Sequence, residues 1–222
     1  MPVDHKERAF ETAIDNYLLA NAGYAQGDAK AFDQERAIFP EEFIAFIRET
    51  QPEIWQALEK LHGASTDTVI LDDLTKALDG HAGALGVIRH GFKCFGKLIR
   101  AAYFAPAHAM NPDSQRLYEA NRLIVTRQVR YSTKHSNSID VVLSLNGIPV
   151  ATAELKNHLS GQNAEHAKHQ YKADRDPRER IFEFKRRALV HFAVDPDVVW
   201  MTTQLSGNKT VFLPFNKGNG TG

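Results

Sequence analysis

The sequence predicts an α/β or α+β domain, with a mixed central sheet flanked by helices and a helical N-terminal part. Three observations predict this fold class. Helical patterns of apolar residues fill roughly the first hundred positions, strand patterns rich in β-branched residues follow from residue 121, and one helical stretch at about 163–173 interrupts the strands. The 222 residues are enough for one substantial hydrophobic core.

The first element is an amphipathic helix expected over residues 7–20. Phe10, Ile14 and Leu18 fall on one stripe of this helix, and Glu11 lies at the edge of the stripe. A stripe of this kind predicts a helix that packs on the core with one face.

Three further helical stretches are expected before the strands. The one over 40–62 begins at Pro40 and is broken at Pro52, because proline fits the first turn of a helix but disrupts its interior. The others cover 67–79 and roughly 80–102, and the glycines of the last one leave its boundaries open.

Six strands are expected in the second half, each a short run rich in β-branched or aromatic residues. In chain order they are "LIVTRQVRY", "SIDVVLSL", "PVATAELK", "LVHFAVD", "VVWMTTQ" and "TVFLPF". The chain ends in "NKGNGTG", a composition typical of a flexible linker, so more protein is expected beyond it.

An Asn-Gly pair at 146–147 marks a hairpin that carries chemically interesting residues. Asn-Gly normally forms a two-residue turn, but in both flanking strands the odd-numbered residues are apolar and the even-numbered ones mostly polar. Matching these faces requires a shift of one residue, so we expect a three-residue loop over 146–148 or a bulge. Asp140 then lies opposite Glu154, with Lys156 two positions along on the same face.

These three residues suit metal-assisted hydrolysis of a phosphodiester. Two facing carboxylates repel each other unless a cation lies between them. Mg²⁺ binds one or two carboxylates together with water and phosphate oxygens, and Lys156 could stabilise charge on a phosphate. The alternative interpretation is a cross-strand network in which Lys156 neutralises Asp140 and Glu154 on a half-exposed face.

The pattern from Asp140 to "ELK" resembles the core of the PD-(D/E)XK nuclease superfamily. The surrounding sequence is more specific, because five segments resemble the N-terminal nuclease region of the R (restriction) subunit of type I restriction-modification enzymes. These segments are "NRLIVTRQVRYS", "SIDVVLSLNGIPVATAELKN", "QYKADRDP", "RRALVHFAVD" and "FLPFNKG". The similarity runs from about Phe10 to the C-terminus.

The resemblance implies Mg²⁺-dependent cleavage of double-stranded DNA by a multisubunit complex. It implies that Asp140 and Glu154 are metal ligands and that Lys156 is the catalytic lysine. Glu11 matches an acidic residue on the first helix that often completes the site in the superfamily. The resemblance therefore implies a restriction-endonuclease-like fold with four of its catalytic residues in place.

Many R subunits also carry a Gln-x-x-x-Tyr motif on the helix after the catalytic strands. Gln170 matches its glutamine and is a further candidate catalytic residue. Four positions later stands Asp174, and the tyrosine is Tyr171. The role of the tyrosine is therefore open.

The domain organisation follows from the same resemblance. It implies a single endonuclease domain over 1–222, consisting of a first core helix (about 1–25), a helical insertion (about 35–102) and the catalytic sheet with its flanking helix (about 120–215). An ATP-driven motor is expected beyond this chain, which has no GxxxxGK[ST] motif. The modification and specificity subunits of the same complex are the expected protein partners.

Charge is unevenly distributed, although the formal net charge is zero. Residues 1–90 carry 8 Lys/Arg and 16 Asp/Glu, whereas residues 91–222 carry 19 and 11. The second half is thus the candidate for contacting DNA. Four of its cations are expected to bind phosphates: Lys168, Lys172, Arg175 and Arg130. His166 and His169 are interpreted as a solvated or DNA-facing surface, because no third zinc ligand has suitable spacing.

A cytoplasmic protein is expected. The single cysteine, Cys94, excludes an internal disulfide, and no apolar run reaches membrane-spanning length. Two alternatives to the nuclease are a non-catalytic DNA-binding or subunit-docking module with a nuclease-like fold, and another enzyme of the superfamily such as a repair exonuclease. The presence of Asp140, Glu154 and Lys156 together favours the nuclease.

Overall fold

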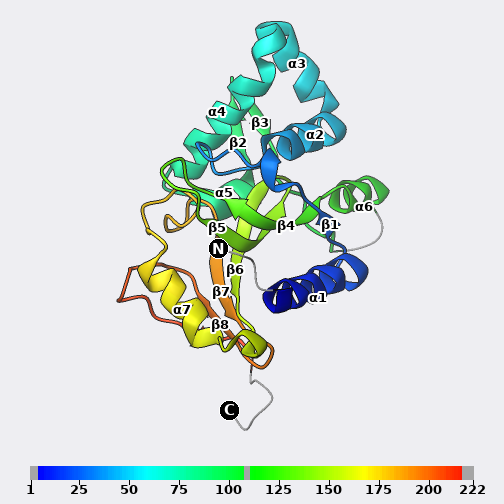
Figure 1. Ribbon diagram of the computed structural model, residues 1–222. Helices are drawn as coiled ribbons and strands as arrows, with labels where there is room; N and C mark the ends of the chain where they lie inside the picture. Colours follow the sequence, from blue (N-terminus) through cyan, green and yellow to red (C-terminus); the bar gives the residue numbers. More distant parts are fainter. Residues whose placement is uncertain (1–4, 108–110, 217–222) are drawn as a thin grey trace.

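The computed structural model describes residues 5–107 and 111–216, with side chains from Ala9 onward. The predicted Gly-rich linker lies outside the described residues from position 217 onward. Figure 1 shows a central sheet with helices around it and a group of helices at one end.

The predicted mixed sheet is confirmed. Among the described residues it has seven strands in the order β1-β4-β5-β6-β7-β8-β9. The β1–β4 and β6–β7 pairs are parallel, and the other neighbours are antiparallel. The strands are β1 (Ala25–Gln26), β4 (Leu123–Arg130), β5 (Ser138–Leu145), β6 (Ile148–Leu155), β7 (Val190–Val194), β8 (Val199–Thr202) and β9 (Leu213–Pro214).

The remaining elements are helices and one small hairpin. The hairpin consists of β2 (Phe92–Cys94) and β3 (Lys97–Ile99). The α-helices are α1 (His5–Asn21), α2 (Pro40–Thr50), α3 (Pro52–His62), α4 (Thr66–Asp79), α5 (Gly83–His90), α6 (Pro112–Glu119) and α7 (Ala164–Ala173), and the 3₁₀ turns are η1 (Ala29–Ala31), η2 (Gly63–Ser65) and η3 (His158–Ser160).

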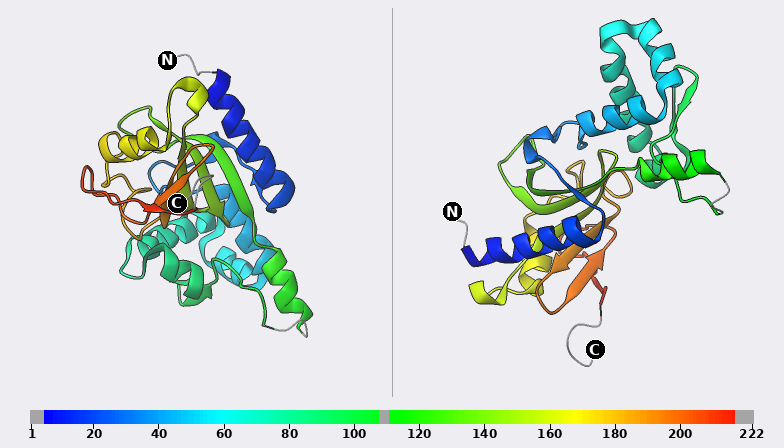
Figure 2. Two further views of the ribbon diagram at one scale, coloured as in Figure 1. Left: turned by 90° about the horizontal axis from the view of Figure 1, so that it is seen from below. Right: turned by 90° about the vertical axis from the view of Figure 1, so that its right-hand side faces the viewer.

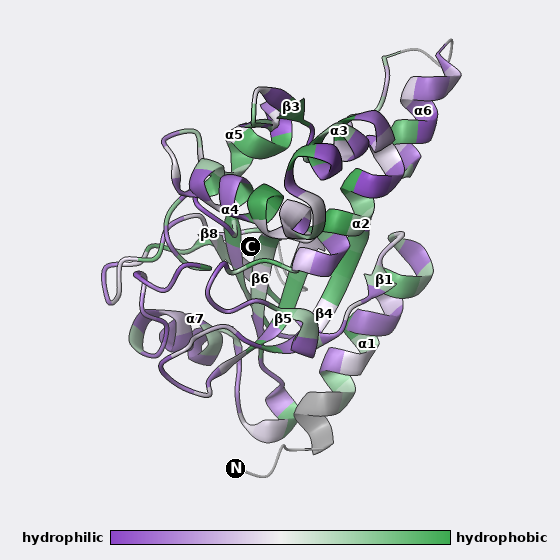
Figure 3. Ribbon diagram, turned by 90° about the horizontal axis from the view of Figure 1, so that it is seen from above, coloured by the Kyte–Doolittle hydropathy of each residue, from purple (hydrophilic) through white to green (hydrophobic). Residues whose placement is uncertain are grey.

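Helices α1 and α7 lie on the two sides of the sheet (Figure 2, left). The predicted stripe of α1, including Phe10 and Ile14, packs with Val125 and Leu155 in one apolar cluster. On the other side, Tyr171 of α7 belongs to a second cluster. Figure 3 shows apolar residues (green) along the central strands and polar residues (purple) on outward helix surfaces.

Helices α2 to α5 and the β2–β3 hairpin form a third apolar cluster at the end of the sheet, seen at the top of Figure 1. Ile148, the first residue of β6, belongs to the same cluster. The two helical stretches expected over 40–62 and 67–79 are confirmed, including the break at Pro52.

The prediction of a helix over 80–102 is confirmed for α5 and wrong for the residues after it. Gly91 ends α5 with a φ of 73°, and a Cβ at this position would lie 2.1 Å from the carbonyl oxygen of Ile99. The chain then reverses through Phe95 and Gly96, which both have positive φ. The short β2–β3 hairpin therefore replaces the second half of the predicted helix. Helix α6 is not anticipated from the apolar pattern, although Asn111 caps its first turn.

The turn between β5 and β6 is a two-residue turn, so the predicted three-residue loop is wrong. Leu145 pairs with Ile148, and the intervening Asn146 and Gly147 have φ of 50° and 80°. The Gly147 carbonyl accepts a hydrogen bond from the Phe39 N–H at 2.8 Å, and a Cβ on Gly147 would lie 2.4 Å from the Phe39 oxygen. Close approach of the chain entering α2 therefore requires glycine here.

The predicted bulge is confirmed one step further along β6. The register shifts between Leu143 and Ser144, because Leu143 pairs with Ala151 whereas Ser144 pairs with Pro149. Val150 is the extra residue. Beyond the bulge, the pairing is the register that the apolar pattern predicts.

Candidate active site

Asp140 and Glu154 lie on the neighbouring antiparallel strands β5 and β6. The ladder ends at the Val141–Ala153 pair, and continuing its register by one residue brings Asp140 opposite Glu154. The Leu155 N–H donates to Asp140 Oδ2 at 2.8 Å, which joins the strands beyond that pair. The predicted register at the site is confirmed.

Glu154 is fully buried, and its two oxygens have different surroundings. Oε1 accepts from the Arg175 Nε at 2.8 Å, whereas Oε2 has no hydrogen-bond partner among the described residues. Burial, and then the charge of Asp140, raise the pKa of Glu154 well above its usual value, while Arg175 and Lys156 act in the opposite direction. A cation at Oε2 would stabilise the ionised carboxylate.

Glu11 reaches the same site from α1, as predicted. Its buried carboxylate accepts from Arg127 Nη2 at 2.7 Å and from Gln128 Nε2 at 3.0 Å. The same Gln128 nitrogen donates to Asp140 Oδ1 at 3.2 Å, so one amide joins Glu11 to Asp140. Burial raises the pKa of Glu11, and the charge of Asp140 adds to this effect, whereas Arg127 and Gln128 oppose it.

Gln128 is a site residue that no pattern in the sequence predicted. It lies within β4 but has a φ of 53°, an uncommon conformation for a residue other than glycine. Ser138 Oγ donates to the Oε1 of Gln128 at 2.8 Å, and the Nε2 of Gln128 donates to the carboxylates of Glu11 and Asp140. Strained backbone that is held by several contacts is found at functional sites.

Near Gln128, the odd-numbered apolar residues of β4 and β5 change from one face of the sheet to the other. Val125 and Val141 belong to the apolar cluster under α1, but Val129 and Ile139 belong to the cluster beside α7. The predicted single apolar face of odd-numbered residues is therefore wrong at Ile139. The left-handed φ of Gln128 accounts for the change of face along β4.

Lys156 follows the last residue of β6 and is half-buried. Its N–H donates to the Val194 carbonyl at 2.9 Å, so the end of β6 is held against β7. The positive charge of Lys156 lowers the pKa of Glu154. The lysine thus lies close to the carboxylates, as the spacing predicts.

The tyrosine of the incomplete motif is a core residue. Tyr171 is fully buried, and its hydroxyl lies 2.8 Å from Thr152 Oγ1, which also lies 2.8 Å from His191 Nδ1. Burial lowers the pKa of His191 to about 3, so its imidazole is neutral. Gln170, one residue earlier on α7, is half-buried, and its catalytic role stays a prediction.

The chain matches the family model described as "Type I restriction enzyme R protein N terminus" over residues 4–210. The chain belongs to this family. The resemblance seen in the sequence is confirmed, and the match spans all of the proposed catalytic residues from Glu11 to Gln170. No curated protein matches the chain. The part of the chain that the structure describes contains no helix with the length and hydrophobicity that a membrane span requires.

The cations that we expected at the DNA surface of this R protein N terminus have different environments. Arg130 is exposed and Lys172 is half-buried. Lys168 pairs with Glu165 and lies 4.0 Å from the centre of the Trp200 ring. Lys168 is therefore already engaged by its own domain, whereas Arg130 faces solvent.

The predicted phosphate contact of Arg175 is wrong. Its side chain is 3% exposed, and it donates to the Ser138 carbonyl at 2.7 Å and the Tyr131 hydroxyl at 3.3 Å besides binding Glu154. Sequence alone suggests a surface cation here because the surrounding "DRDP" is polar. The acidic partner lies 21 positions away along the chain, so only the fold reveals it.

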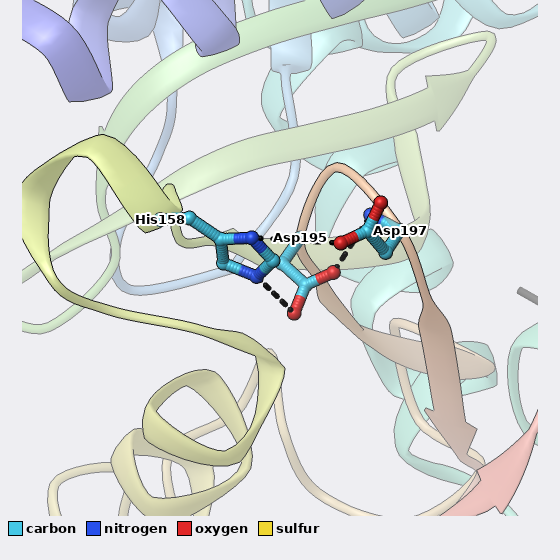
Figure 4. A group of neighbouring side chains, drawn as sticks. All are labelled: His158, Asp195 and Asp197. Atoms are coloured by element: carbon cyan, nitrogen blue, oxygen red, sulfur yellow. Dashed lines mark hydrogen bonds and ion pairs between the residues drawn. The ribbon is translucent and has the colours of Figure 1, made fainter. Parts of the chain in front are cut away.

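A second group of potential metal ligands contains none of the predicted ones (Figure 4). His158 of η3 contacts Asp195 Oδ2 at 3.3 Å and Asp197 Oδ2 at 3.5 Å. Asp195 already accepts from the N–H groups of Ala164 and Val198, at 2.8 and 2.9 Å. In the R protein N terminus this cluster caps α7 and the β7–β8 turn, and it needs no ion for that role.

His166, part of the weaker metal candidate, has a structural role. Its Nδ1 lies 2.9 Å from Asn163 Oδ1 and also accepts from the Asn163 N–H at 3.2 Å. Asn163 caps α7, so His166 completes a reciprocal cap. Among the described residues, the group with metal-ligating geometry includes neither His166 nor His169.

Proposed function

We propose that this R protein N-terminal domain is a Mg²⁺-dependent endonuclease that hydrolyses phosphodiester bonds of double-stranded DNA. The observation that supports this most is the convergence of Glu11, Asp140 and Glu154, from three different elements, beside Lys156. A buried carboxylate oxygen without a protein partner, in Glu154, is the second support.

The donor set fits a hard divalent cation. Mg²⁺ prefers carboxylate oxygens and keeps several waters for phosphate or solvent. Burial, with the charge of Asp140 as a further cause, raises the pKa of both Glu11 and Glu154, and a bound cation would favour their ionised forms. Asp140 and Glu154 would hold the ion, with Glu11 completing the site from α1.

The protein's own groups have distinct tasks in this proposal. A bound Mg²⁺ would polarise the phosphate and lower the pKa of a bound water. Lys156 would stabilise negative charge that develops on the phosphate or orient the attacking water. Gln128 holds Glu11 and Asp140 in place, and Arg175 fixes Glu154. Gln170 on α7 is proposed to contribute from the opposite side.

We further propose that cleavage follows ATP-driven translocation by a motor that is not part of this chain. In that arrangement the substrate is unmodified double-stranded DNA, and the modification and specificity subunits of the cytoplasmic complex are the partners. ATP would act only through the motor. Arg130 and Lys172 would contribute DNA contacts without reading sequence.

The competing function is a non-catalytic DNA-binding or docking module. A module that had lost catalysis would not need a buried Glu154 oxygen without a partner, because such an atom costs stability. The convergence of the three carboxylates favours a catalytic function over a binding function. A repair exonuclease of the same superfamily is disfavoured by the family match.

The test uses the full-length R subunit in its assembled complex. We expect Asp140→Asn to abolish plasmid linearisation, because developing charge loses its main stabiliser and the rate falls on the order of a thousandfold or more. Lys156→Ala should have the same effect. ATP hydrolysis and translocation, measured in parallel, should persist. Undiminished linearisation by Asp140→Asn would refute the proposal, and joint loss of both activities would indicate a structural role for Asp140.

A further inference from the structure

A pocket of about 390 Å³ lies between η1 and the end of β4, and Gln128, which contacts the carboxylates, is part of its lining. Two cationic side chains, two amides and two apolar residues line it: Ala29, Lys30, Phe32, Gln34, Gln128 and Arg130. Gln128 and Arg130 are two positions apart on β4. The nuclease site proposed above makes no use of Lys30, Phe32 or Gln34.

The charge of the pocket is positive and is not balanced by the domain. Lys30 and Arg130 are exposed, and within the described part of the chain neither forms an ion pair. The nearby Asp28 caps η1 by accepting from the Lys30 N–H at 2.9 Å, and Asp33 pairs with Arg36. Two cations that form no ion pair, at the lining of one pocket, are suited to an anion.

The rim of the pocket has a defined shape. Gln34 Nε2 donates to the Arg130 carbonyl at 3.2 Å, which ties the segment after η1 to β4. Phe32 is 7% exposed, and its ring packs edge-on against Phe39 with the centroids 5.1 Å apart. The pocket is therefore bounded by a packed aromatic side chain and by a segment that is hydrogen-bonded to β4.

Gln128 connects this pocket to the proposed catalytic carboxylates. It lines the pocket, and its Nε2 donates to Glu11 and Asp140. DNA approaching Asp140 meets three acidic residues, so its backbone needs cations nearby to offset the repulsion. Lys30 and Arg130 line the same pocket as Gln128, whose amide contacts the acids.

We propose that this pocket binds a backbone phosphate of the cleaved strand, adjacent to the scissile phosphate, through Lys30 and Arg130. This inference rests on the proposed nuclease function and adds a subsite to it. The ligand is a phosphodiester, because the two cations and the Gln34 amide supply donors for its oxygens. Binding one flanking phosphate fixes the position of the next one over the carboxylates.

The experiment measures non-specific binding of a short duplex to the full-length R subunit at a series of KCl concentrations. Each phosphate contact contributes about 0.9 to the slope of log affinity against log salt. Lys30→Gln and Arg130→Gln should each lower the slope by about 0.9, and the double variant by about twice that. Arg130→Lys should retain most of the slope, because the charge is kept.

The matched control is Lys93→Gln, an exposed lysine on β2 that is not among the residues lining the pocket. It should leave the slope unchanged. If Lys30→Gln and Arg130→Gln behave like Lys93→Gln, with unaltered thermal unfolding, the subsite does not exist. Asp140→Asn should keep the slope and lose only cleavage, so failure of the nuclease proposal is visible separately.

Discussion

Arg175 and Glu154 form a buried ion pair in which two guanidinium nitrogens hold one carboxylate oxygen. Arg175 Nε and Nη2 lie 2.8 and 2.7 Å from Glu154 Oε1, and the exposed fractions of the two side chains are 3% and 0%. Both charged groups have lost their contact with water, so each is stabilised mainly by the opposite charge of its partner. The pair also fixes which Glu154 oxygen remains for another ligand.

Removing the arginine should destabilise the domain. Arg175→Met leaves the buried Glu154 charge without its partner, for which about 3–5 kcal/mol of unfolding free energy is typical. The measurement is urea unfolding of the purified R subunit, followed by a probe of this domain. Partial recovery in Arg175→Met/Glu154→Gln is expected, because the second change removes the uncompensated charge.

Arg178→Met is the matched control for that prediction. Arg178 is three positions later, its side chain is 88% exposed, and its ion pair with Asp176 faces solvent. Surface pairs contribute about 0–1 kcal/mol. Equal stability of the Arg175 and Arg178 variants would contradict a structural role for the buried pair.

Two substitutions of Gln128 separate its backbone strain from its side-chain bonds. Gln128→Ala removes the amide that joins Glu11 to Asp140 but keeps the left-handed φ of 53°. Gln128→Gly also removes the amide and accepts this φ without strain. We expect both to impair cleavage alike, with the glycine variant more stable by up to about 1 kcal/mol.

Plasmid cleavage and thermal unfolding are the two measurements for Gln128. A variant that unfolds normally but cleaves poorly identifies a positioning role for the amide. Wild-type cleavage by Gln128→Ala would show that Glu11 and Asp140 hold their positions without it.

Gly147→Ala should be strongly destabilising for two reasons. The residue has a φ of 80°, and an added Cβ would meet the Phe39 oxygen at 2.4 Å and the Phe43 nitrogen at 2.9 Å. Left-handed strain alone costs about 1–2 kcal/mol, and the clash adds to it. Unfolding midpoints in urea measure the loss.

Gly161→Ala isolates the strain component. Gly161 has a similar φ of 74°, but nothing lies within 4 Å of an added Cβ. It should therefore cost less than Gly147→Ala. If the two variants lose the same unfolding free energy, the close approach of the β5–β6 turn to Phe39 does not contribute to the cost of Gly147→Ala.

Glu42 on α2 should make stability depend on pH near neutrality. Burial raises the pKa of Glu42 to about 7, against the opposing effects of Ser144 and Arg122. The folded state therefore holds a proton that the unfolded state releases at lower pH. The contribution is fully present below the unfolded pKa, near 4.5, and is lost as the pH rises through about 7.

The neutral variant Glu42→Gln tests this sign. The unfolding free energy of the wild type, relative to that of Glu42→Gln, should decrease as the pH rises from 5 to about 8. Denaturant midpoints at several pH values provide the measurement. A constant difference across this range would show that Glu42 titrates normally in the folded domain.

Much of the architecture and the centre of the candidate site could be predicted from the amino-acid pattern. Alternation of apolar and polar residues in β5 and β6 fixed the register of Asp140 against Glu154, because a shift of one residue would expose the whole apolar set. Helix α1 followed from the stripe around Phe10. These inferences rest on local periodicity, which a single sequence displays, whereas Glu11 was selected because it matches an acidic residue of the nuclease superfamily.

The environment of each charged residue, in contrast, could be known only from the folded domain. Arg175 becomes the partner of Glu154, and Gln128 becomes the link from Glu11 to Asp140, through contacts between residues 21 and 117 positions apart. The β2–β3 reversal and the bulge at Val150 likewise depend on what the backbone meets in space. Desolvation and pairing act between segments that only folding brings together, so a charged residue in a polar stretch carries no local sign of whether it will be buried.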